Sequence, residues 1–103
     1  MVFIRKDLPL ADQLVQVGHV CQVAGRKFDI PSDCHMVLIG VDSNESLSKI
    51  AESLECRGIR FVDFYEPDSI DDGIIPMGVT AICSEPITKE QKKYFSRFPL
   101  WKP

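Results

Sequence analysis

A glutamine and a histidine, Gln16 and His19, lie three residues apart in a segment with helical periodicity. At 100° per residue they share one ridge with Asp12 and Val23. A divalent metal site would have to be built from Asp12, His19 and Asp68. Because only Asp12 lies at helical spacing beside His19, we expect no metal there. The alternative for Gln16 and His19 is that both are ordinary solvated helix positions.

Further along the chain, an acidic segment at 66–76 leads into an apolar one, and polar side chains stand in both. Asp68 follows a proline, where a carboxylate can act in a site or simply cap its own turn. Asp72 lies in the same segment, and Thr80 lies in the apolar run that follows. The Thr80 hydroxyl can donate a hydrogen bond, although a β-branched residue is also ordinary filling for a strand.

Alternating apolar and turn-forming segments predict the elements that must position these side chains. We expect strands at residues 2–4, 35–41, 59–65 and 77–83, and helices at 11–24, about 43–57 and 89–98. This order, with a near-continuous apolar strand at 35–41, predicts an α/β protein. The expected architecture is a three-layer α/β/α sandwich around a small four-stranded mixed sheet. Its ligand site should lie at the carboxyl ends of the strands.

The first predicted helix has an apolar stripe that should face the core. The stripe consists of Leu14, Val17, Cys21 and Ala24. Gly25 is placed to end this helix. In the second helix, Asp42 or Ser43 can provide the cap and Gly58 the end. Thr88 can cap the last helix, which stops before Pro99.

The composition is that of a soluble globular protein, since 45% of the residues are apolar and 26% are charged. With 103 residues the chain has room for one domain, residues 1–103. No apolar run reaches the roughly 20 residues that cross a bilayer, so we expect no membrane association. The opening MVFIRKD is too short and too early charged for a signal peptide, which predicts a cytoplasmic protein.

The four cysteines are scattered singly through apolar stretches, at positions Cys21, Cys34, Cys56 and Cys83. A free thiol in such a stretch behaves as a small hydrophobe, so we expect reduced, buried thiols. Their spacing matches no zinc pattern. A thiol-based enzyme that uses Cys21 or Cys83 is the alternative, and it requires a thiol that reacts in the native protein.

The formal net charge of −3 argues against broad, non-specific nucleic-acid binding, but it leaves room for a local basic patch. Basic residues gather near both ends of the sequence: Arg5, Lys6, Arg26, Lys27, Lys89, Lys92, Lys93, Arg97 and Lys102. In the closing helix the basic residues alternate with aromatic ones. We expect the aromatic side chains to dock on the sheet, and contact of the lysines with phosphates is the alternative role.

Several short motifs together resemble the type 2 peptidyl-tRNA hydrolases, the archaeal and eukaryotic family of these enzymes. The matching segments are Arg5-Lys6-Asp7-Leu8 after the first strand, Gln16 and His19 in the first helix, Asp68 in the acidic loop, Ile74-x-Pro76 after it, Thr80 on the last strand and residues 93–101 at the end. The resemblance covers nearly the whole chain, although each motif is short.

The resemblance implies that the chain hydrolyses the ester bond that joins a peptide to tRNA. It implies that Asp68 acts on the attacking water, that Thr80 donates to the carbonyl oxygen and that Gln16 holds the ester or its neighbouring amide. The side chains implied on the substrate side are His19, Arg5, Lys6, Asp12 and Asp72. The family implies no metal and no cofactor, tRNA as the partner and, because its members are often dimers, a homodimer.

Two departures from the family pattern leave a second function open. The family's helix lysine falls on Asp12, and the threonine four residues after the loop aspartate falls on Asp72. Both changes add negative charge to a site that must approach phosphates. Diverged relatives with the same fold, including a bacterial family of unknown function, also begin with an Asp-Leu-Pro segment. The alternative is therefore a non-catalytic binding or regulatory module of unknown ligand.

Overall fold

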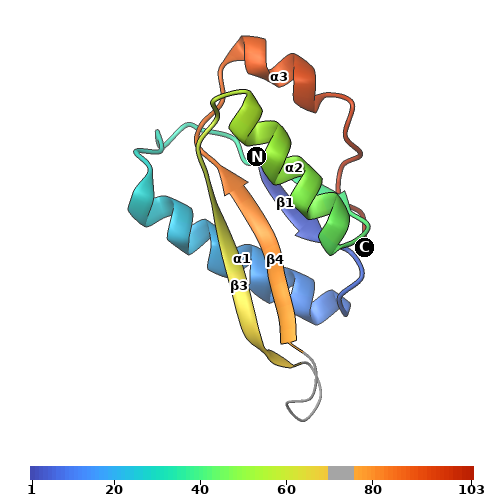
Figure 1. The fold of residues 1–103 in the computed structure, drawn as a ribbon. Helices are drawn as coiled ribbons and strands as arrows, with labels where there is room; N and C mark the ends of the chain where they lie inside the picture. The colour runs from blue at the N-terminus through green and yellow to red at the C-terminus, as the bar shows by residue number, and fades with distance from the viewer. Residues whose placement is uncertain (70–75) are drawn as a thin grey trace.

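The computed structural model describes residues 1–69 and 76–103, in which strands and helices follow the order β1, α1, β2, α2, β3, β4 and α3 (Figure 1). The strands are β1 (Val2–Arg5), β2 (Leu38–Val41), β3 (Phe61–Ser69) and β4 (Pro76–Ser84). The helices are α1 (Leu10–Lys27), α2 (Asn44–Cys56) and α3 (Lys89–Phe95). The predicted order of elements is confirmed for these residues.

In the described part of the chain, four strands form one mixed sheet in the order β2-β1-β4-β3. Strand β1 is parallel to β2 and antiparallel to β4, whereas β3 and β4 form an antiparallel hairpin. The parallel pair is joined through α1, because parallel neighbours need a crossover connection. The prediction of an α/β protein with a small four-stranded mixed sheet is confirmed.

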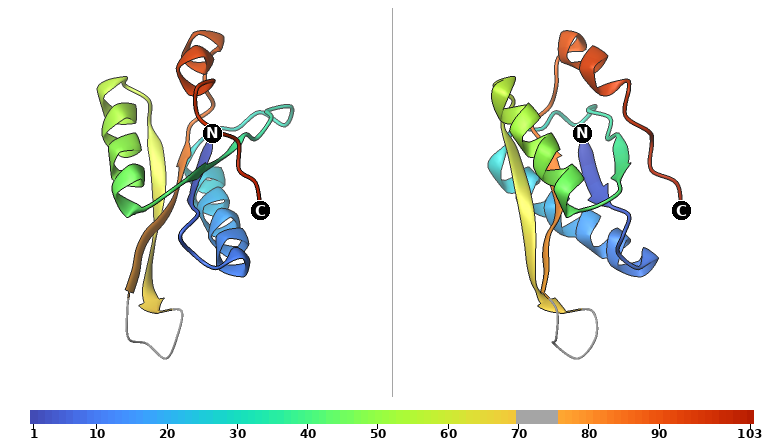
Figure 2. Two further views of the ribbon diagram at one scale, coloured as in Figure 1. Left: turned by 90° about the vertical axis from the view of Figure 1, so that its right-hand side faces the viewer. Right: turned by 45° about the vertical axis from the view of Figure 1, so that its right-hand side comes forward.

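Helices lie on both faces of the sheet, because successive side chains of β1 point to opposite sides. Phe3 belongs to one cluster of buried side chains, together with Leu54 of α2 and Phe95 of α3. Ile4 belongs to another cluster, together with Val20 of α1. Accordingly, Figure 2 shows α1 on one side of the sheet and α2 on the other.

The segment after α3 runs along the outer edge of β2. The backbone N–H of Trp101 donates to the carbonyl oxygen of Leu38 at 2.9 Å, and Leu100 forms an antiparallel bridge with Ile39. Phe98, near the beginning of this segment, meets the ring of Phe3 edge-on with 6.0 Å between the ring centroids. The closing segment is thereby fixed to the sheet at both its beginning and its end.

Helices α2 and α3 begin as their sequences predict. The side chain of Ser43 accepts a hydrogen bond from the backbone N–H of Ser46, and Thr88 and Gln91 form a reciprocal capping box. After α2 the chain passes through Gly58 in the left-handed conformation, with φ of 71°. None of the helices among the described residues is long and apolar enough to cross a membrane.

Helix α1 does not end at Gly25, and that prediction is wrong. The helix continues to Lys27, and the backbone N–H of Phe28 donates to the carbonyl oxygen of Ala24 at 2.9 Å. A glycine ends a helix where the chain turns in the left-handed conformation. Here the chain leaves the helix in an extended conformation at Phe28, which any residue can adopt.

The buried stripe of α1 also differs from the predicted one. Leu14 is 56% exposed, whereas Gln13 and Gln16 are buried together with Val20 and Ala24. The assignment of Gln16 to a ridge outside the core is therefore wrong. Burial of an amide is tolerated where hydrogen bonds satisfy it, and both glutamines have such bonds to distant parts of the chain, Gln13 with Trp101 and Gln16 with Thr80.

The hairpin strands are longer than predicted, and β2 and α3 are shorter. β3 continues to Ser69 and β4 begins at Pro76, so that residues 66–69 belong to a strand rather than to the predicted acidic loop. Strand β2 begins at Leu38, and the exposed residues 34–36 precede it as a loop. Cross-strand hydrogen bonds favour the longer hairpin over the local turn preference of its residues.

Two glycine substitutions test the ends of α1 and α2. In Gly25→Ala the new methyl group lies in a helix and meets nothing within 4 Å, so the free energy of unfolding should rise by about 0.5–1 kcal/mol. In Gly58→Ala an L side chain must adopt the left-handed conformation, so the same quantity should fall by about 1–2 kcal/mol. Urea unfolding measures both changes. A loss of stability in Gly25→Ala would contradict the continuous helix.

Candidate functional site

The amide of Gln16 and the hydroxyl of Thr80 meet between α1 and β4. Thr80 Oγ1 donates a hydrogen bond to Gln16 Oε1 at 2.8 Å and lies 3.3 Å from the carbonyl oxygen of Phe64. Thr80 is fully buried, and Gln16 is 2% exposed. Two of the three residues expected to act in catalysis are therefore in direct contact.

A β-bulge turns Thr80 toward α1. Phe64 pairs with Ala81, whereas the next residue of β3 pairs with Val79. Thr80 is thus the extra residue of β4 at this point of the register. Strict alternation would place Thr80 on the face of α2, opposite to Ala81. The bulge instead directs its hydroxyl to Gln16, which is the kind of re-aiming that bulges provide beside functional sites.

His19 lies one turn after Gln16 and contacts the same hairpin. Its imidazole is stacked on the ring of Phe64, with 4.6 Å between the centroids and 10° between the planes. His19 is half-buried in this position. Gln16 and His19 therefore both contact the β3–β4 hairpin, Gln16 through a hydrogen bond and His19 through its ring.

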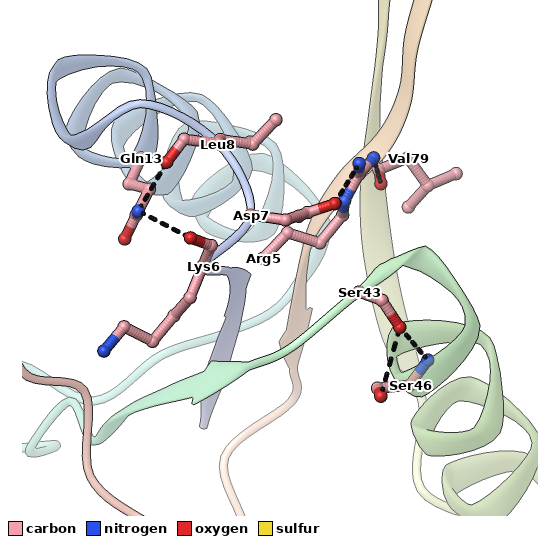
Figure 3. A network of polar contacts seen from close by, with 8 residues as sticks. All are labelled: Arg5, Lys6, Asp7, Leu8, Gln13, Ser43, Ser46 and Val79. Carbon is pink, nitrogen blue, oxygen red and sulfur yellow. Dashed lines mark hydrogen bonds and ion pairs between the residues drawn. The ribbon is translucent and has the colours of Figure 1, made fainter.

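Arg5 lies beside the bulge in β1, the strand that flanks β4 on the side opposite to β3. Its Nε and Nη2 atoms each donate to the carboxylate of Asp7 at 2.9 Å, and Nη1 donates to the carbonyl oxygen of Val79 at 3.2 Å (Figure 3). The hydrogen bonds from Arg5 lower the pKa of Asp7. Their contribution to stability is therefore present above the ordinary pKa of an aspartate and is lost as the pH falls below it.

Gln13 is a buried polar residue that the sequence analysis did not select. Its Nε2 donates to the carbonyl oxygens of Leu8 at 2.7 Å and Lys6 at 3.3 Å, and its Oε1 accepts from the indole N–H of Trp101 at 2.8 Å. Gln13 therefore joins the start of α1 to the turn after β1 and to the closing segment. The signal in the sequence was its position three residues before Gln16, on the same helix face.

Lys6 is not part of the Gln16 and Thr80 cluster. Figure 3 shows its side chain pointing away from Arg5. Its stem covers Gly40 so closely that a Cβ atom added there would lie 2.5 Å from Lys6 Cδ. Lys6 instead lines an open groove of about 460 Å³ that also contains Asp42 and Lys102.

Asp12 lies half-buried in the first turn of α1. The residue before the helix, Pro9, provides no side-chain cap. A carboxylate in the first turn stabilises the positive end of the helix dipole, which gives Asp12 a structural role at this position. Across residues 1–69 and 76–103, no three His, Cys, Asp or Glu side chains are grouped so that they could hold a metal ion.

Asp68 lies in β3, beyond the level of Thr80. A second register shift of the hairpin falls after Glu66 and includes the position of Asp68. Asp68 is three to four residues farther along the hairpin than Thr80, or about 12 Å at the usual rise of a strand. Asp72 and Ile74 lie outside the described residues.

A groove with several basic side chains lies between α2, the end of β2 and the closing segment. One part of about 490 Å³ is lined by Lys49, Arg97 and Tyr94, and it shares Asp42 with the groove that contains Lys6. The guanidinium of Arg97 lies 4.4 Å from the centroid of the Tyr94 ring. Phe95 at the end of α3 and Phe98 after it both contact Phe3 of β1, so the prediction that these aromatic side chains dock on the sheet is confirmed.

The thiols differ in exposure and in protonation. All four cysteines are free, with Cys83 buried, Cys21 half-buried, and Cys34 and Cys56 exposed. Burial raises the pKa of Cys83 to about 11, and it also raises the pKa of Cys21. Both thiols are therefore protonated at neutral pH, whereas a nucleophilic cysteine needs a lowered pKa. This protonation argues against an enzyme that uses Cys21 or Cys83 as the nucleophile.

No protein-family model matches the chain, and no curated protein matches it. The relation to the type 2 peptidyl-tRNA hydrolases therefore stays a resemblance of motifs. The contact between Gln16 and Thr80 is the structural observation that bears on it most directly.

The contact between Gln16 and Thr80 can be tested by mutation. Thr80→Val keeps the volume but leaves the Gln16 oxygen buried without this donor, so the free energy of unfolding should fall by about 1–3 kcal/mol. Thr80→Ser keeps the hydroxyl and should lose about 1 kcal/mol through the missing methyl group. When Thr80→Val is combined with Gln16→Leu, the losses should be non-additive by about 0.5 kcal/mol or more. Additive losses in urea unfolding would refute the coupling.

Alkylation distinguishes the four thiols. With iodoacetamide at neutral pH, the exposed Cys34 and Cys56 should react in the native protein, and Cys83 should react only after unfolding. Peptide mass spectrometry identifies the labelled positions. Rapid labelling of native Cys83 would restore the thiol-enzyme alternative.

The raised pKa of Cys83 also makes stability depend on pH. Its contribution to the free energy of unfolding is present below the ordinary pKa of a thiol and is lost as the pH rises toward 11.

Proposed function

We propose that the chain has the fold of the type 2 peptidyl-tRNA hydrolases and hydrolyses the ester bond between peptide and tRNA. The observation that supports the proposal is the hydrogen bond between Gln16 and Thr80, which are 64 residues apart in sequence. The resemblance of motifs requires these two side chains to meet, and no local feature of the sequence brings them together. The bulge in β4 provides the backbone geometry for this contact.

Ester hydrolysis needs a base for the attacking water and a donor for the developing oxyanion. In the proposed mechanism Thr80 donates to the carbonyl oxygen of the ester, and Asp68 accepts the proton of the attacking water. The backbone of Asp68 lies about 12 Å along the hairpin from that of Thr80, so the mechanism requires the two residues to approach each other when the substrate binds. The hydroxyl of Thr80 has a single proton, which it gives to Gln16 in the substrate-free protein. The ester oxygen must therefore replace Gln16 Oε1 as the acceptor, and Gln16 is then available to hold the neighbouring amide.

The phosphates of tRNA need positive charge, and the groove beside β2 and α2 supplies some of it. Lys6, Lys49, Arg97 and Lys102 line its two parts, with Asp42 between them. The charge of Arg5 is balanced by Asp7, and Asp12 adds a carboxylate on α1. Phosphate contacts are therefore expected from the groove more than from α1, and binding should weaken as salt is added.

A second candidate is a binding module without catalytic activity. The observation that favours it is the burial of Thr80, whose hydroxyl is engaged within the protein. The resemblance also requires a lysine where Asp12 stands. In this alternative the Gln16 and Thr80 contact serves only to hold α1 on the hairpin.

Release of peptide from peptidyl-tRNA separates the two candidates. The wild-type protein should be active, and Asp68→Asn should lower kcat/KM by about 100-fold or more. Asp63→Asn is the matched control, because Asp63 is an exposed carboxylate on the same strand. Thr80→Ser should retain activity that Thr80→Ala loses. Inactivity of folded wild-type protein, or full activity of the Asp68→Asn, Thr80→Ala double variant, would reject the enzymatic proposal.

A further inference from the structure

Two arginines, a tyrosine and a serine form a cluster where the C-terminal ends of α2 and α3 meet. The guanidinium carbon of Arg57 lies 3.5 Å from the centroid of the Tyr94 ring, and that of Arg97 lies 4.4 Å from the same centroid. The hydroxyl of Tyr94 is hydrogen-bonded to the hydroxyl of Ser53 on α2. One aromatic ring therefore holds two positive charges no more than about 8 Å apart.

Carboxylates of the protein do not neutralise these two charges. Arg60, another exposed arginine that lies over a ring, is paired with the carboxylate of Glu85. In the described part of the chain, no carboxylate forms an ion pair with Arg57 or Arg97. Like charges at this separation repel each other. An anion that binds to both guanidinium groups would remove this repulsion, so the cluster is suited to a negatively charged ligand.

A third cation lies next to the cluster. Lys49, Ser53 and Arg57 follow one another at four-residue spacing, so they lie on the same face of α2 and its C-cap. Lys49 and Ser53 also line the groove of about 490 Å³ between α2 and the closing segment, together with Tyr94 and Arg97. The two bonded hydroxyls thus lie among three cations at one end of a groove.

We propose that Lys49, Arg57 and Arg97 bind a phosphate group with two negative charges, either a free phosphate ion or the phosphate monoester of a small molecule. The planar guanidinium group donates two parallel hydrogen bonds to phosphate oxygens, which makes arginine a preferred phosphate ligand. The hydroxyls of Ser53 and Tyr94 are further donors at the same place.

The charge of the site selects a dianion. The three cations exceed Asp42, the carboxylate among the described residues of the groove lining, by two charges. A phosphate monoester carries about −1.5 to −2 at pH 7, whereas each phosphate of a nucleic-acid backbone carries one negative charge. The rest of the groove has room for the molecule to which the phosphate is joined. This binding needs neither tRNA nor ester hydrolysis and is therefore independent of the proposed function.

Titrations followed by the amide signals of the ¹⁵N-labelled protein test the proposal. At pH 7.5 and constant ionic strength, ribose 5-phosphate and inorganic phosphate should each cause saturable shifts around Ser53 and Tyr94. Dimethyl phosphate should bind about tenfold more weakly or worse, because it carries a single charge. Tighter binding of ribose 5-phosphate identifies a monoester as the ligand, and tighter binding of inorganic phosphate identifies the free ion.

Two substitutions remove the charges one at a time. Arg57→Gln and Arg97→Gln should each weaken the binding of ribose 5-phosphate by at least about tenfold, through loss of hydrogen bonds between charged groups. Both side chains are exposed, so neither change disturbs the core. Arg60→Gln is the matched control, because it removes the same charge from an exposed arginine whose partner is Glu85. Its affinity should equal that of the wild-type protein.

Three results would overturn the phosphate site. The first is a wild-type protein whose signals show no saturable shift with either ribose 5-phosphate or inorganic phosphate. The second is binding of dimethyl phosphate as tight as that of ribose 5-phosphate. The third is a loss of affinity in Arg60→Gln as large as that in Arg57→Gln, since it would show that only the net charge of the protein matters.

Discussion

The position of α1 depends on two buried amides. A polar group that leaves water is unfavourable unless it finds hydrogen-bond partners, and Gln13 and Gln16 both lie on the buried face of this helix. Gln16 finds the hydroxyl of Thr80, and Gln13 finds two backbone carbonyls and the indole of Trp101. Thr80 and Trp101 lie 64 and 88 residues away from these glutamines in the sequence. The rotation of α1 is therefore fixed jointly with the bulge in β4 and with the closing segment.

Local signals in the sequence predicted most of the architecture. The caps at Ser43 and Thr88 and the left-handed glycine at position 58 act through residues a few positions away, so that the sequence pattern contains them. The order of elements and the mixed sheet follow from the same patterns. Gly25 was misread because the turn that follows α1 is extended, and that depends on where Phe28 packs.

The buried face of α1 could not be predicted in the same way. An apolar stripe through Leu14 is the usual choice for a core face, and glutamines are usually exposed. Only the bulge at Thr80 and the indole of Trp101 make the other face favourable, and neither is visible in the periodicity of the helix. The resemblance of motifs selected Gln16 and Thr80 together, although the predicted apolar stripe through Leu14 placed Gln16 outside the core.

The α1 side of the sheet also contains two distinct chemical environments. Near the middle of the helix, Gln16, His19 and Thr80 form a polar and aromatic contact with the hairpin. One to two turns later, Cys21 and Ala24 border a cavity of about 200 Å³ that is also lined by the sulfur-bearing side chains of Cys34, Met36 and Cys83. Hydrogen-bonding groups and soft sulfur groups are thus separated along one helix, which allows each environment to be altered without the other.

The closing segment has a consequence for how copies of this protein can meet. An exposed strand edge offers unpaired N–H and C=O groups to other chains and is a common starting point for aggregation. On β2 this edge is occupied by the protein's own backbone at Leu100 and Trp101. Growth of the sheet by addition of a foreign strand at β2 would first require that intramolecular pairing to open. The closing segment therefore opposes edge-to-edge association of two sheets at β2.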